Sequence, residues 1–357
     1  MKLFLISNMY PSAADSLFGV FVQNFKNELE KQGATFSKLS LIKGKSSSIF
    51  KKLSSYINHY YSCINNYASN DYDLIYVHYL THHIPILSLF NLNKKKVVIN
   101  SHGSDIIGLQ NSPFLNFFAK RILKKVHLIV VPTSYFKAKI IDYYPFLDSN
   151  KIYVSPSAGI EAHKFYSKQQ KTFTSKTLSL GFISRFIEEK GWKTYLQALV
   201  ELKEAEIPFK AVMAGKGPDE SQILEFIEEN ELSTNLNYLG LVKQDELIDI
   251  YNDLDLYIFP TYREAESLGL TGLEAMSCGA AVVSCNVSGP TTYVENNING
   301  YLFPPKDTTE LVKIIKHYYK LNSNEKEKMS LAALETAKQY ESKRVNKKLY
   351  EKLIQTL

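Results

Sequence analysis

The sequence predicts an α/β fold with two domains, each built on a parallel β-sheet. The chain has 357 residues, which is long for one domain and comfortable for two. Its hydrophobic content of 45% is sufficient for full cores. Short apolar runs of strand length alternate with longer amphipathic stretches in both halves, and this alternation is typical of doubly wound parallel sheets.

The apolar runs give the expected order of strands. They are residues 3–6, 74–77, 97–99 and 128–131 in the first half, and 178–183, 209–214, 236–239, 256–259 and 281–284 in the second. Residues 168–176 are polar and lack periodicity, so we predict the linker there. The predicted domains are residues 1–168 and 169–340, with a final helix over 341–357. We expect the two domains to face each other across a cleft, with ligands at the carboxyl ends of the strands.

Composition also limits the location of the protein. The three cysteines (Cys63, Cys278 and Cys285) are odd in number and lack metal-ligand spacing, which fits a reducing compartment. Lys2 is followed by an apolar run too short for a signal peptide, and no apolar run approaches 18 residues. We therefore predict a cytoplasmic protein.

The charge is unevenly distributed along the chain. Residues 1–170 carry 20 basic and 9 acidic residues, a net charge of +11, whereas residues 171–357 carry 22 and 27, a net charge of −5. Residues 113–126 also read as a basic amphipathic helix, with Lys120, Arg121, Lys124 and Lys125. Both features favour peripheral contact with an anionic membrane on its inner face. The alternatives are a solubilising surface and a core helix with a solvated basic side. No interleaved aromatic and basic patch indicates a nucleic-acid partner.

The most informative stretch places Glu266 and Glu274 eight residues apart across a turn that opens a helix over 270–277. A helix amino terminus offers free N–H groups to a phosphate, and carboxylates accept hydrogen bonds from sugar hydroxyls. The pair therefore suggests a site for a nucleotide sugar. The alternative is a solvated Glu266 and a Glu274 that complements the helix dipole.

Two further loops carry polar groups just after predicted strands. Arg185 and Lys190 lie five residues apart in the loop after residues 178–183, and two cations at this spacing can neutralise a diphosphate. His102 and Asp105 follow residues 97–99 in the same way. Because parallel strands end at one edge of their sheet, these positions suit a ligand site.

These motifs together resemble the retaining glycosyltransferases of the GT-B class, and within them the large family 4 of bacterial polysaccharide and lipid glycosyltransferases. The resemblance covers nearly the whole chain, and it implies that the final helix over 341–357 crosses back to the first domain. The matching segments, in order, are 18–21, 102–105, 185–191, 215–218 and the Glu-x7-Glu run with residues 275–279. The chain departs from the family pattern at Ser267-Leu268, where Gly-Phe is common, and at 157–160, where many members have Asn-Gly.

The resemblance implies roles for individual residues. Glu274 would bind the ribose hydroxyls, and Glu266 would face the donor sugar as a catalytic residue together with His102. The His-Gly-Ser-Asp context favours His102 as a hydrogen-bond donor beside the reacting sugar, and the alternative is a structural histidine. From their positions, Asp105 would orient His102 or the acceptor, or cap the following turn, and His78 would lie on the acceptor side. The remaining donor-binding positions are Arg185 and Lys190 for the diphosphate, the amides of Leu270 and Thr271 for the phosphates, Gly19 for close backbone approach, and Gly217 and Val242 beside the nucleobase.

We discount a metal. The Asp-x-Asp pairs at 71–73 and 253–255 open their strands instead of following them, so their carboxylates should lie away from the site. His82 and His83 lack a convincing set of metal partners. No cofactor is therefore expected.

The sequence thus predicts a metal-independent, retaining glycosyltransferase. It would move a sugar from a nucleoside diphosphate sugar, UDP-linked more than GDP-linked, to a glycan or lipid-linked acceptor in bacterial surface polysaccharide or glycolipid synthesis. The alternatives are a nucleotide-sugar epimerase or phosphorylase on the same fold, or a non-catalytic partner subunit.

Overall fold

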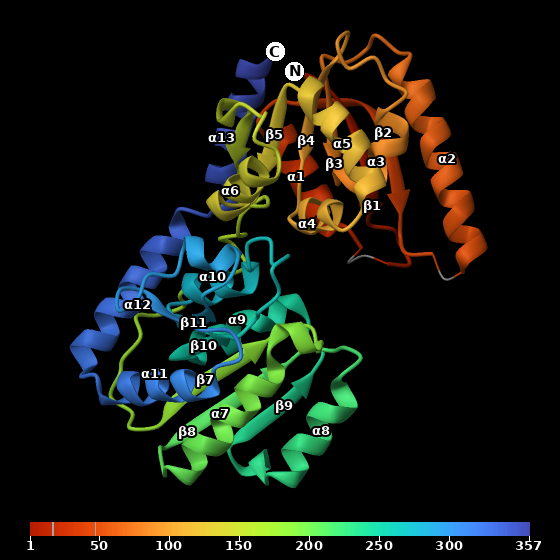
Figure 1. Cartoon of the computed structure of the whole chain (residues 1–357). Helices are drawn as coiled ribbons and strands as arrows, with labels where there is room; N and C mark the ends of the chain where they lie inside the picture. Colours follow the sequence, from red (N-terminus) through yellow and green to blue (C-terminus); the bar gives the residue numbers. More distant parts are fainter. Residues whose placement is uncertain (16–17, 47) are drawn as a thin grey trace. The chain divides into compact units, whose positions relative to one another are not determined.

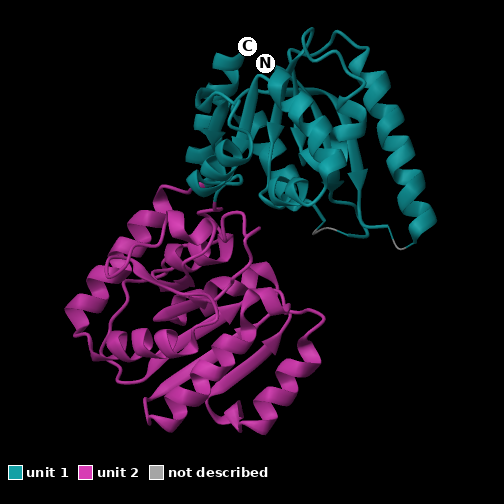
Figure 2. Cartoon of the chain, viewed as in Figure 1, with its two compact units in different colours: residues 1–159, 342–357 teal, residues 160–341 magenta. Residues whose placement is uncertain are grey.

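The computed structural model describes residues 1–15, 18–46 and 48–357. The chain divides into two compact units, which Figure 2 shows in different colours. Unit 1 comprises residues 1–159 and 342–357, and unit 2 comprises residues 160–341. Each unit has one six-stranded sheet of parallel strands with helices around it (Figure 1). The predicted α/β fold with two Rossmann-like units is therefore confirmed.

Unit 1 has the strand order β2-β1-β3-β4-β5-β6. The strands are β1 (Lys2–Tyr10), β2 (Thr35–Lys43), β3 (Leu74–His78), β4 (Lys96–Asn100), β5 (Leu128–Val131) and β6 (Ile152–Val154). The helices are α1 (Val20–Lys31), α2 (Ile49–Tyr67), α3 (Leu80–Leu87), α4 (Ser104–Gln110), α5 (Pro113–Lys125), α6 (Ser134–Tyr143) and α13 (Ser342–Thr356).

Both faces of the unit 1 sheet are buried. Successive side chains of a strand point to opposite faces, so one strand contributes to the core on each side. In β1, Phe4 and Ile6 belong to one core cluster, and Leu3 and Leu5 belong to the other. A sheet covered on both sides needs near-continuous apolar strands. The central strands can therefore be recognised in the sequence as short apolar runs.

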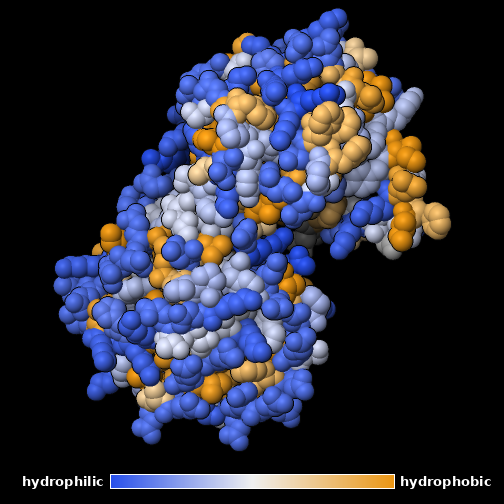
Figure 3. All heavy atoms as spheres, in the orientation of Figure 1, coloured by the Kyte–Doolittle hydropathy of each residue, from blue (hydrophilic) through white to orange (hydrophobic). Residues whose placement is uncertain are grey.

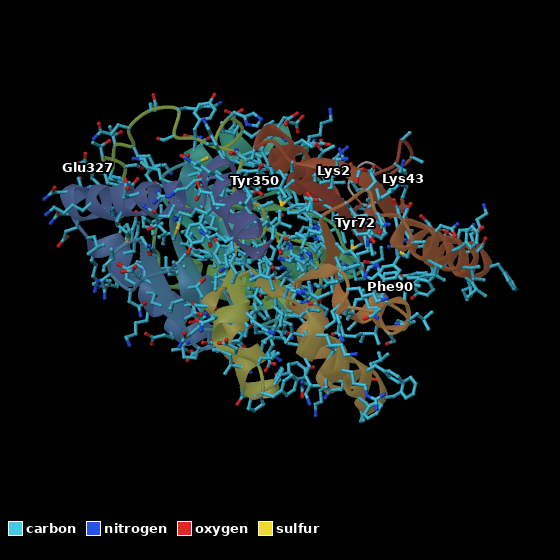
Figure 4. The ribbon with its side chains drawn as sticks, turned by 90° about the horizontal axis from the view of Figure 1, so that it is seen from above. Lys2, Lys43, Tyr72, Phe90, Glu327 and Tyr350 are labelled. Atoms are coloured by element: carbon cyan, nitrogen blue, oxygen red, sulfur yellow. The ribbon has the colours of Figure 1, made fainter. Side chains whose placement is uncertain are left out.

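The last helix, α13, belongs to unit 1 although its sequence follows unit 2. Its Leu349 and Leu353 are buried in the same cluster as Leu3, and Lys96 Nζ donates a 2.9 Å hydrogen bond to the carbonyl of Thr356. Figure 4 labels Tyr350 on this helix. The helix predicted over 341–357 thus completes one face of the first sheet.

Unit 2 has the strand order β12-β11-β10-β7-β8-β9. The strands are β7 (Leu178–Ile183), β8 (Phe209–Ala214), β9 (Leu236–Gly240), β10 (Leu256–Phe259), β11 (Ala281–Cys285) and β12 (Gly300–Phe303). The helices are α7 (Trp192–Glu204), α8 (Glu220–Glu229), α9 (Leu247–Asp253), α10 (Leu270–Ser277), α11 (Thr308–Lys320) and α12 (Ser323–Lys338).

Unit 2 begins at residue 160, earlier than the predicted boundary at 168. Ile160 and Phe165 are buried in a core cluster of unit 2. The polar segment 168–176 is fastened to the same unit. The backbone N–H of Lys168 donates to Asn252 at 2.9 Å, and the Lys171 ammonium donates to the carbonyl of Leu254. The polar composition that predicted a linker therefore belongs to a surface segment of unit 2, and apolar residues just before this segment lie in the core of the same unit.

No described helix is both long enough and apolar enough to cross a membrane.

Candidate functional site

The loops after β7 and β8 are held together at the carboxyl edge of the unit 2 sheet. The N–H of Phe186 donates to the carbonyl of Lys216 at 3.1 Å, and the N–H of Asp219 donates to the carbonyl of Phe186 at 3.2 Å. A Cβ atom at Gly217 would lie 2.1 Å from that Phe186 oxygen, so only glycine fits. The structure therefore brings Gly217 into contact with the loop that carries Arg185, whose side chain is exposed.

Lys190 and Glu266 form an ion pair in unit 2. Each side chain is 13% exposed, so water screens this pair less than a surface pair. Two contacts position the partners. The hydroxyl of Ser288 donates to the carbonyl of Glu266 at 2.7 Å. The turn at Gly191 has φ +76°, and a Cβ atom there would lie 2.1 Å from the carbonyl oxygen of Pro260. Two charges predicted from separate loops thus meet beside the end of β10.

Helix α10 begins at Leu270, as predicted, directly after Gly269 in the left-handed conformation with φ +77°. A Cβ atom at Gly269 would lie 2.6 Å from the ring of Phe259. The N-cap residue is Gly269, which has no side chain with which to cap this amino terminus. The first amides of the helix, those of Leu270 and Thr271, lack partners within the helix and carry its positive partial charge.

Glu274, in the second turn of α10, carries a perturbed carboxyl group. Burial raises the pKa of Glu274 to about 7, and a hydrogen bond from Tyr251 opposes this shift. The Tyr251 hydroxyl donates to Glu274 Oε2 at 3.2 Å. Glu161 also raises the pKa and Lys164 lowers it. Tyr251 could not be identified from the sequence, because α9 carries no local motif that points to it.

Val242 follows β9 at the same edge of the sheet. The N–H of Gly215 donates to the carbonyl of Gly240 at 2.7 Å, which ties the loops after β8 and β9 together. Val242 is partly buried and packs against the core cluster that contains Leu273 and Met276 of α10. Its side chain therefore has a structural role in addition to its predicted place near the nucleobase.

In unit 1 the structure brings His102 and His78 together. His78 ends β3 and His102 follows β4, which pairs with β3 in register. Their rings are nearly parallel, and His78 Nδ1 lies 2.9 Å from His102 Nε2. Burial lowers the pKa of His102 to about 4, and Asp105 opposes this shift. Both imidazoles are therefore neutral at pH 7, since burial also lowers the pKa of His78.

The neutral pair has a preferred proton arrangement. His78 Nε2 is buried and has no hydrogen-bond partner among the described residues. An unpartnered buried N–H is rarer in proteins than an under-satisfied acceptor. We therefore assign the proton of His78 to Nδ1, where it is donated to His102 Nε2. His102 then carries its own proton on Nδ1 and offers it as a donor.

Asp105 is buried and fastens two loops of unit 1. Its Oδ1 accepts hydrogen bonds from the hydroxyl of Ser101 at 2.6 Å and from the N–H of His102 at 2.9 Å, and its Oδ2 accepts from the N–H of Leu80 at 3.0 Å. It also accepts from the N–H of Ile106. Asp105 thus both caps the following turn and orients the His102 backbone. Asp105 and His78, predicted on the acceptor side, are both buried in unit 1.

Gly19 lies beside this group. It precedes α1 with φ +73°, and a Cβ atom there would lie 2.5 Å from the backbone of Met9. Phe21, two residues on, has its ring centroid 4.8 Å from that of His102, and the Tyr79 ring stacks on His102 at 4.5 Å. The end of β1 therefore requires glycine at this position, and the approach of the phosphates or the acceptor to the Gly19 backbone stays a prediction.

The two Asp-x-Asp pairs lie at the amino ends of their strands. Asp73 accepts from the N–H of Lys2, and Asp71 forms an ion pair with the Lys2 ammonium. Asp255 accepts from the N–H of Ser179 at 2.8 Å. In the described part of the chain, no group of three or more His, Cys, Asp or Glu side chains is arranged to hold a metal ion.

Two known families match successive parts of the chain. Residues 20–158 match Glycosyltransferase Family 4, and residues 164–336 match Glycosyl transferases group 1. The chain belongs to glycosyltransferase family 4, with the GT-B fold. It is similar to the N-acetyl-alpha-D-glucosaminyl L-malate synthase of Bacillus anthracis, with 26% identity over 66% of this chain and 62% of that protein. It is also similar to the amylovoran biosynthesis glycosyltransferase AmsK of Erwinia amylovora, with 28% identity over 44% and 39%.

The alignments thus span less than two thirds of these family 4 relatives. Solved structures, in contrast, resemble this chain over nearly its whole length. Anabaena Alr3699/HepE, in complex with UDP-glucose, superposes with a TM-score of 0.73 over 99% of both chains, at 18% identity. This likeness supports the GT-B fold for the two units.

Proposed function

We propose that this family 4 protein transfers a sugar from a nucleoside diphosphate sugar to a hydroxyl group of a glycan or lipid-linked acceptor. The observation that carries the proposal is the edge of the unit 2 sheet, where Arg185, the Lys190–Glu266 pair and the amino end of α10 with Glu274 follow the strand ends. Cations and helix amides suit a diphosphate, and a carboxylate suits ribose hydroxyls. The solved neighbour that holds UDP-glucose favours a UDP-linked donor. The relative named for amylovoran biosynthesis favours surface polysaccharide synthesis.

In the proposed donor site, the diphosphate competes with Glu266 for Lys190. The exposed Arg185 contacts the phosphates without giving up an ion pair to any described residue, whereas Lys190 must exchange its carboxylate for phosphate oxygens. This exchange releases the Glu266 carboxylate to accept hydrogen bonds from the donor sugar. The amides of Leu270 and Thr271 bind a phosphate oxygen, and Glu274 binds the ribose.

The proposed reaction retains the anomeric configuration. The bond from the anomeric carbon to the diphosphate breaks while the acceptor oxygen attacks the same face, through an ion-pair-like transition state. The acceptor proton passes to the leaving diphosphate oxygen. Arg185, Lys190 and the α10 amino terminus stabilise the charge on the diphosphate, so the proposal requires no metal. It also requires no covalent nucleophile.

We assign His102 to a hydrogen bond with a hydroxyl group of the reacting sugars. Its support is the neutral ring, with Nδ1–H available as a donor. His78 and Asp105 are positioning residues in this proposal. His78 binds Nε2 of His102, and Asp105 accepts from the backbone N–H of His102. We further propose that the protein works at the cytoplasmic side of an anionic membrane, which the positive charge of the first half favours.

A screen of the full chain against a panel of nucleotide sugars tests the proposed function. Mass spectrometry should detect release of the nucleoside diphosphate from one donor, slowly to water and faster with a glycan or glycolipid acceptor. Conversion of the donor to an isomeric nucleotide sugar would indicate an epimerase, and dependence on inorganic phosphate would indicate a phosphorylase. Failure to turn over or bind any donor would refute the proposal.

A further inference from the structure

We propose that helix α2, with the lysines of its first turn and those at positions 43 and 45, docks on an anionic lipid bilayer. This inference rests on the membrane contact proposed above and identifies the surface that makes it. Six apolar or aromatic side chains of α2 point away from the unit 1 core. We call them the α2 face: Ile49, Phe50, Leu53, Ile57, Tyr61 and Ile64.

The side chains of the α2 face are largely exposed to solvent. Ile49 is 84% exposed and Phe50 is 86% exposed, while Leu53 and Ile57 are each 60% exposed. Figure 3 shows hydrophobic side chains gathered along the edge of unit 1 that α2 forms in Figure 1. Isolated apolar residues at a surface need no explanation, but a contiguous stripe along one helix marks an interaction site.

The stripe is separate from the side of α2 that holds the helix to unit 1. From Phe50 onward its members recur every three or four residues and therefore lie along one side of the helix, and Ile49 is the first residue of that helix. His59 and Cys63 are buried on another side, and Asn66 donates to the carbonyl of Leu39 in β2 at 3.2 Å. Attachment of α2 to unit 1 thus leaves the α2 face free, so its apolar character serves a partner outside this unit.

Charge indicates which partner. Residues 31–70 contain six lysines and no Asp or Glu. Lys51 and Lys52 lie in the first turn of α2, and Lys43 and Lys45 lie in the segment that leads to it. Ser46 Oγ is 3.5 Å from Ser55 Oγ, which holds that segment beside α2, and Figure 4 labels Lys43 on this side of unit 1. All four lysines are exposed.

The four lysines outweigh one carboxylate beside them, that of Asp15, which accepts from the N–H of Lys45 at 3.3 Å. An apolar stripe beside this net positive rim fits a bilayer with anionic headgroups. The helix would lie in the plane of the interface, with apolar side chains at the headgroup and acyl boundary and ammonium groups beside lipid phosphates. A second copy of this chain fits less well, because two α2 faces in contact would bring their lysines together without opposing carboxylates.

Helix α5, the membrane helix predicted from the sequence, is a weaker candidate. Ala119, Ile122 and Leu123 are buried in the unit 1 core. Two of its basic groups are engaged, because Arg121 lies over the ring of Phe117 at 4.3 Å and Lys124 lies over another aromatic ring at 5.0 Å. Its exposed aromatic residues make α5 a matched control.

Cosedimentation with vesicles tests the inference. The full chain should sediment with vesicles of phosphatidylglycerol and phosphatidylcholine at low salt, and not with phosphatidylcholine alone. Replacing Phe50, Leu53 and Ile57 by Ser should lower the partition coefficient by about a hundredfold or more. Replacing Lys51 and Lys52 by Gln should lower it by about tenfold or more and weaken its salt dependence.

The matched control replaces Phe114 and Phe117 of α5 by Ser, and it should change the partition coefficient by less than about threefold. If the α5 control and the α2 Ser variant bind anionic vesicles equally well, α2 is not the docking surface. That result would overturn the inference and leave the proposed membrane contact intact. Wild-type protein that ignores anionic vesicles would overturn both. A wild-type dimer that the α2 substitutions dissociate, without vesicle binding, would assign the face to self-association. Donor affinity, measured by calorimetry, should be unchanged in the α2 variants, so failure of the transfer proposal would be seen separately.

Discussion

Donor binding should strengthen as the pH rises through about 7, because a buried carboxyl group in unit 2 must lose its proton. Burial raises the pKa of Glu274 to about 7, and the hydrogen bond from Tyr251 lowers it in part. An ionised carboxylate accepts charge-assisted hydrogen bonds from both ribose hydroxyls, and these are stronger than bonds to the neutral acid.

The size of the effect follows from the ionised fraction. A group with a pKa of about 7 is roughly 90% ionised at pH 8 and roughly 3% ionised at pH 5.5. If only the ionised form binds ribose, donor affinity falls by up to about thirtyfold between these values. Stability runs the other way. The pKa of Glu274 is raised from 4.5, so its contribution to stability is fully present below about pH 4.5 and is lost as the pH rises through about 7.

The assay is calorimetric titration of the full chain with the donor identified by the screen, from pH 5.5 to 8. In a nucleotide sugar both ends of the diphosphate are esterified, so the ligand itself does not titrate in this range. Glu274→Gln should bind weakly with a flat profile, because the amide is neutral throughout. Tyr251→Phe should move the wild-type profile to higher pH, because it removes a hydrogen bond that favours the charged form. A wild-type profile as flat as that of Glu274→Gln would refute this reasoning.

Three further predictions follow from the remaining contacts. Lys190→Met should lower the free energy of unfolding of unit 2 by about 3 kcal/mol in urea denaturation, because it leaves Glu266 without its cation. Adding Glu266→Gln should restore more than half of this loss, and additive losses would contradict the pairing. His78→Phe should slow transfer by about tenfold with donor affinity within about twofold, because it removes the proton donor to His102; unchanged steady-state rates would contradict this role. Activity should survive EDTA within about a factor of two, and NMR should show that the product keeps the anomeric configuration of the donor. Complete loss with EDTA, restored by Mg²⁺, or an inverted product would contradict the metal-independent, retaining reaction.

The central strands and α10 could be predicted from the sequence because their signals are local. Buried parallel strands appear as short apolar runs, and α10 follows a strand, a proline and a glycine turn that together mark its start. The strands that were missed are β2, β6 and β12, which lie at sheet edges. In β2 only one of nine positions is fully buried, so its sequence lacks a continuous apolar run. This reason does not extend to β12, which is buried at three of its four positions.

The site was predicted in part for the same reason. Arg185, Lys190 and Glu266 could be placed at one sheet edge because each follows a strand, and β7 and β10 are neighbours. The pairing of Lys190 with Glu266 depends on how two loops close, which no local pattern records. The hydrogen bond from Tyr251 to Glu274 likewise depends on tertiary packing.

The α2 face shows a different limit. Helix α2 carries apolar residues on more than one side, and the sequence alone does not say which of them are buried. The basic helix over 113–126 was the more obvious membrane candidate because its charge is concentrated. Packing reverses the comparison, since α5 places much of its apolar surface in the core while α2 leaves a stripe uncovered.

The central claim is that unit 2 binds a nucleoside diphosphate sugar through Arg185 and Glu274. Calorimetric titration with the donor, at pH 8, tests it most directly in Arg185→Ala, Glu274→Ala and the matched control Arg344→Ala, whose arginine is exposed on α13 in unit 1. Because a charge-assisted hydrogen bond contributes roughly 1.5–3 kcal/mol, each of the first two variants should bind about tenfold to over a hundredfold more weakly, and the control should match the wild type. Wild-type affinity in both folded site variants would contradict the account.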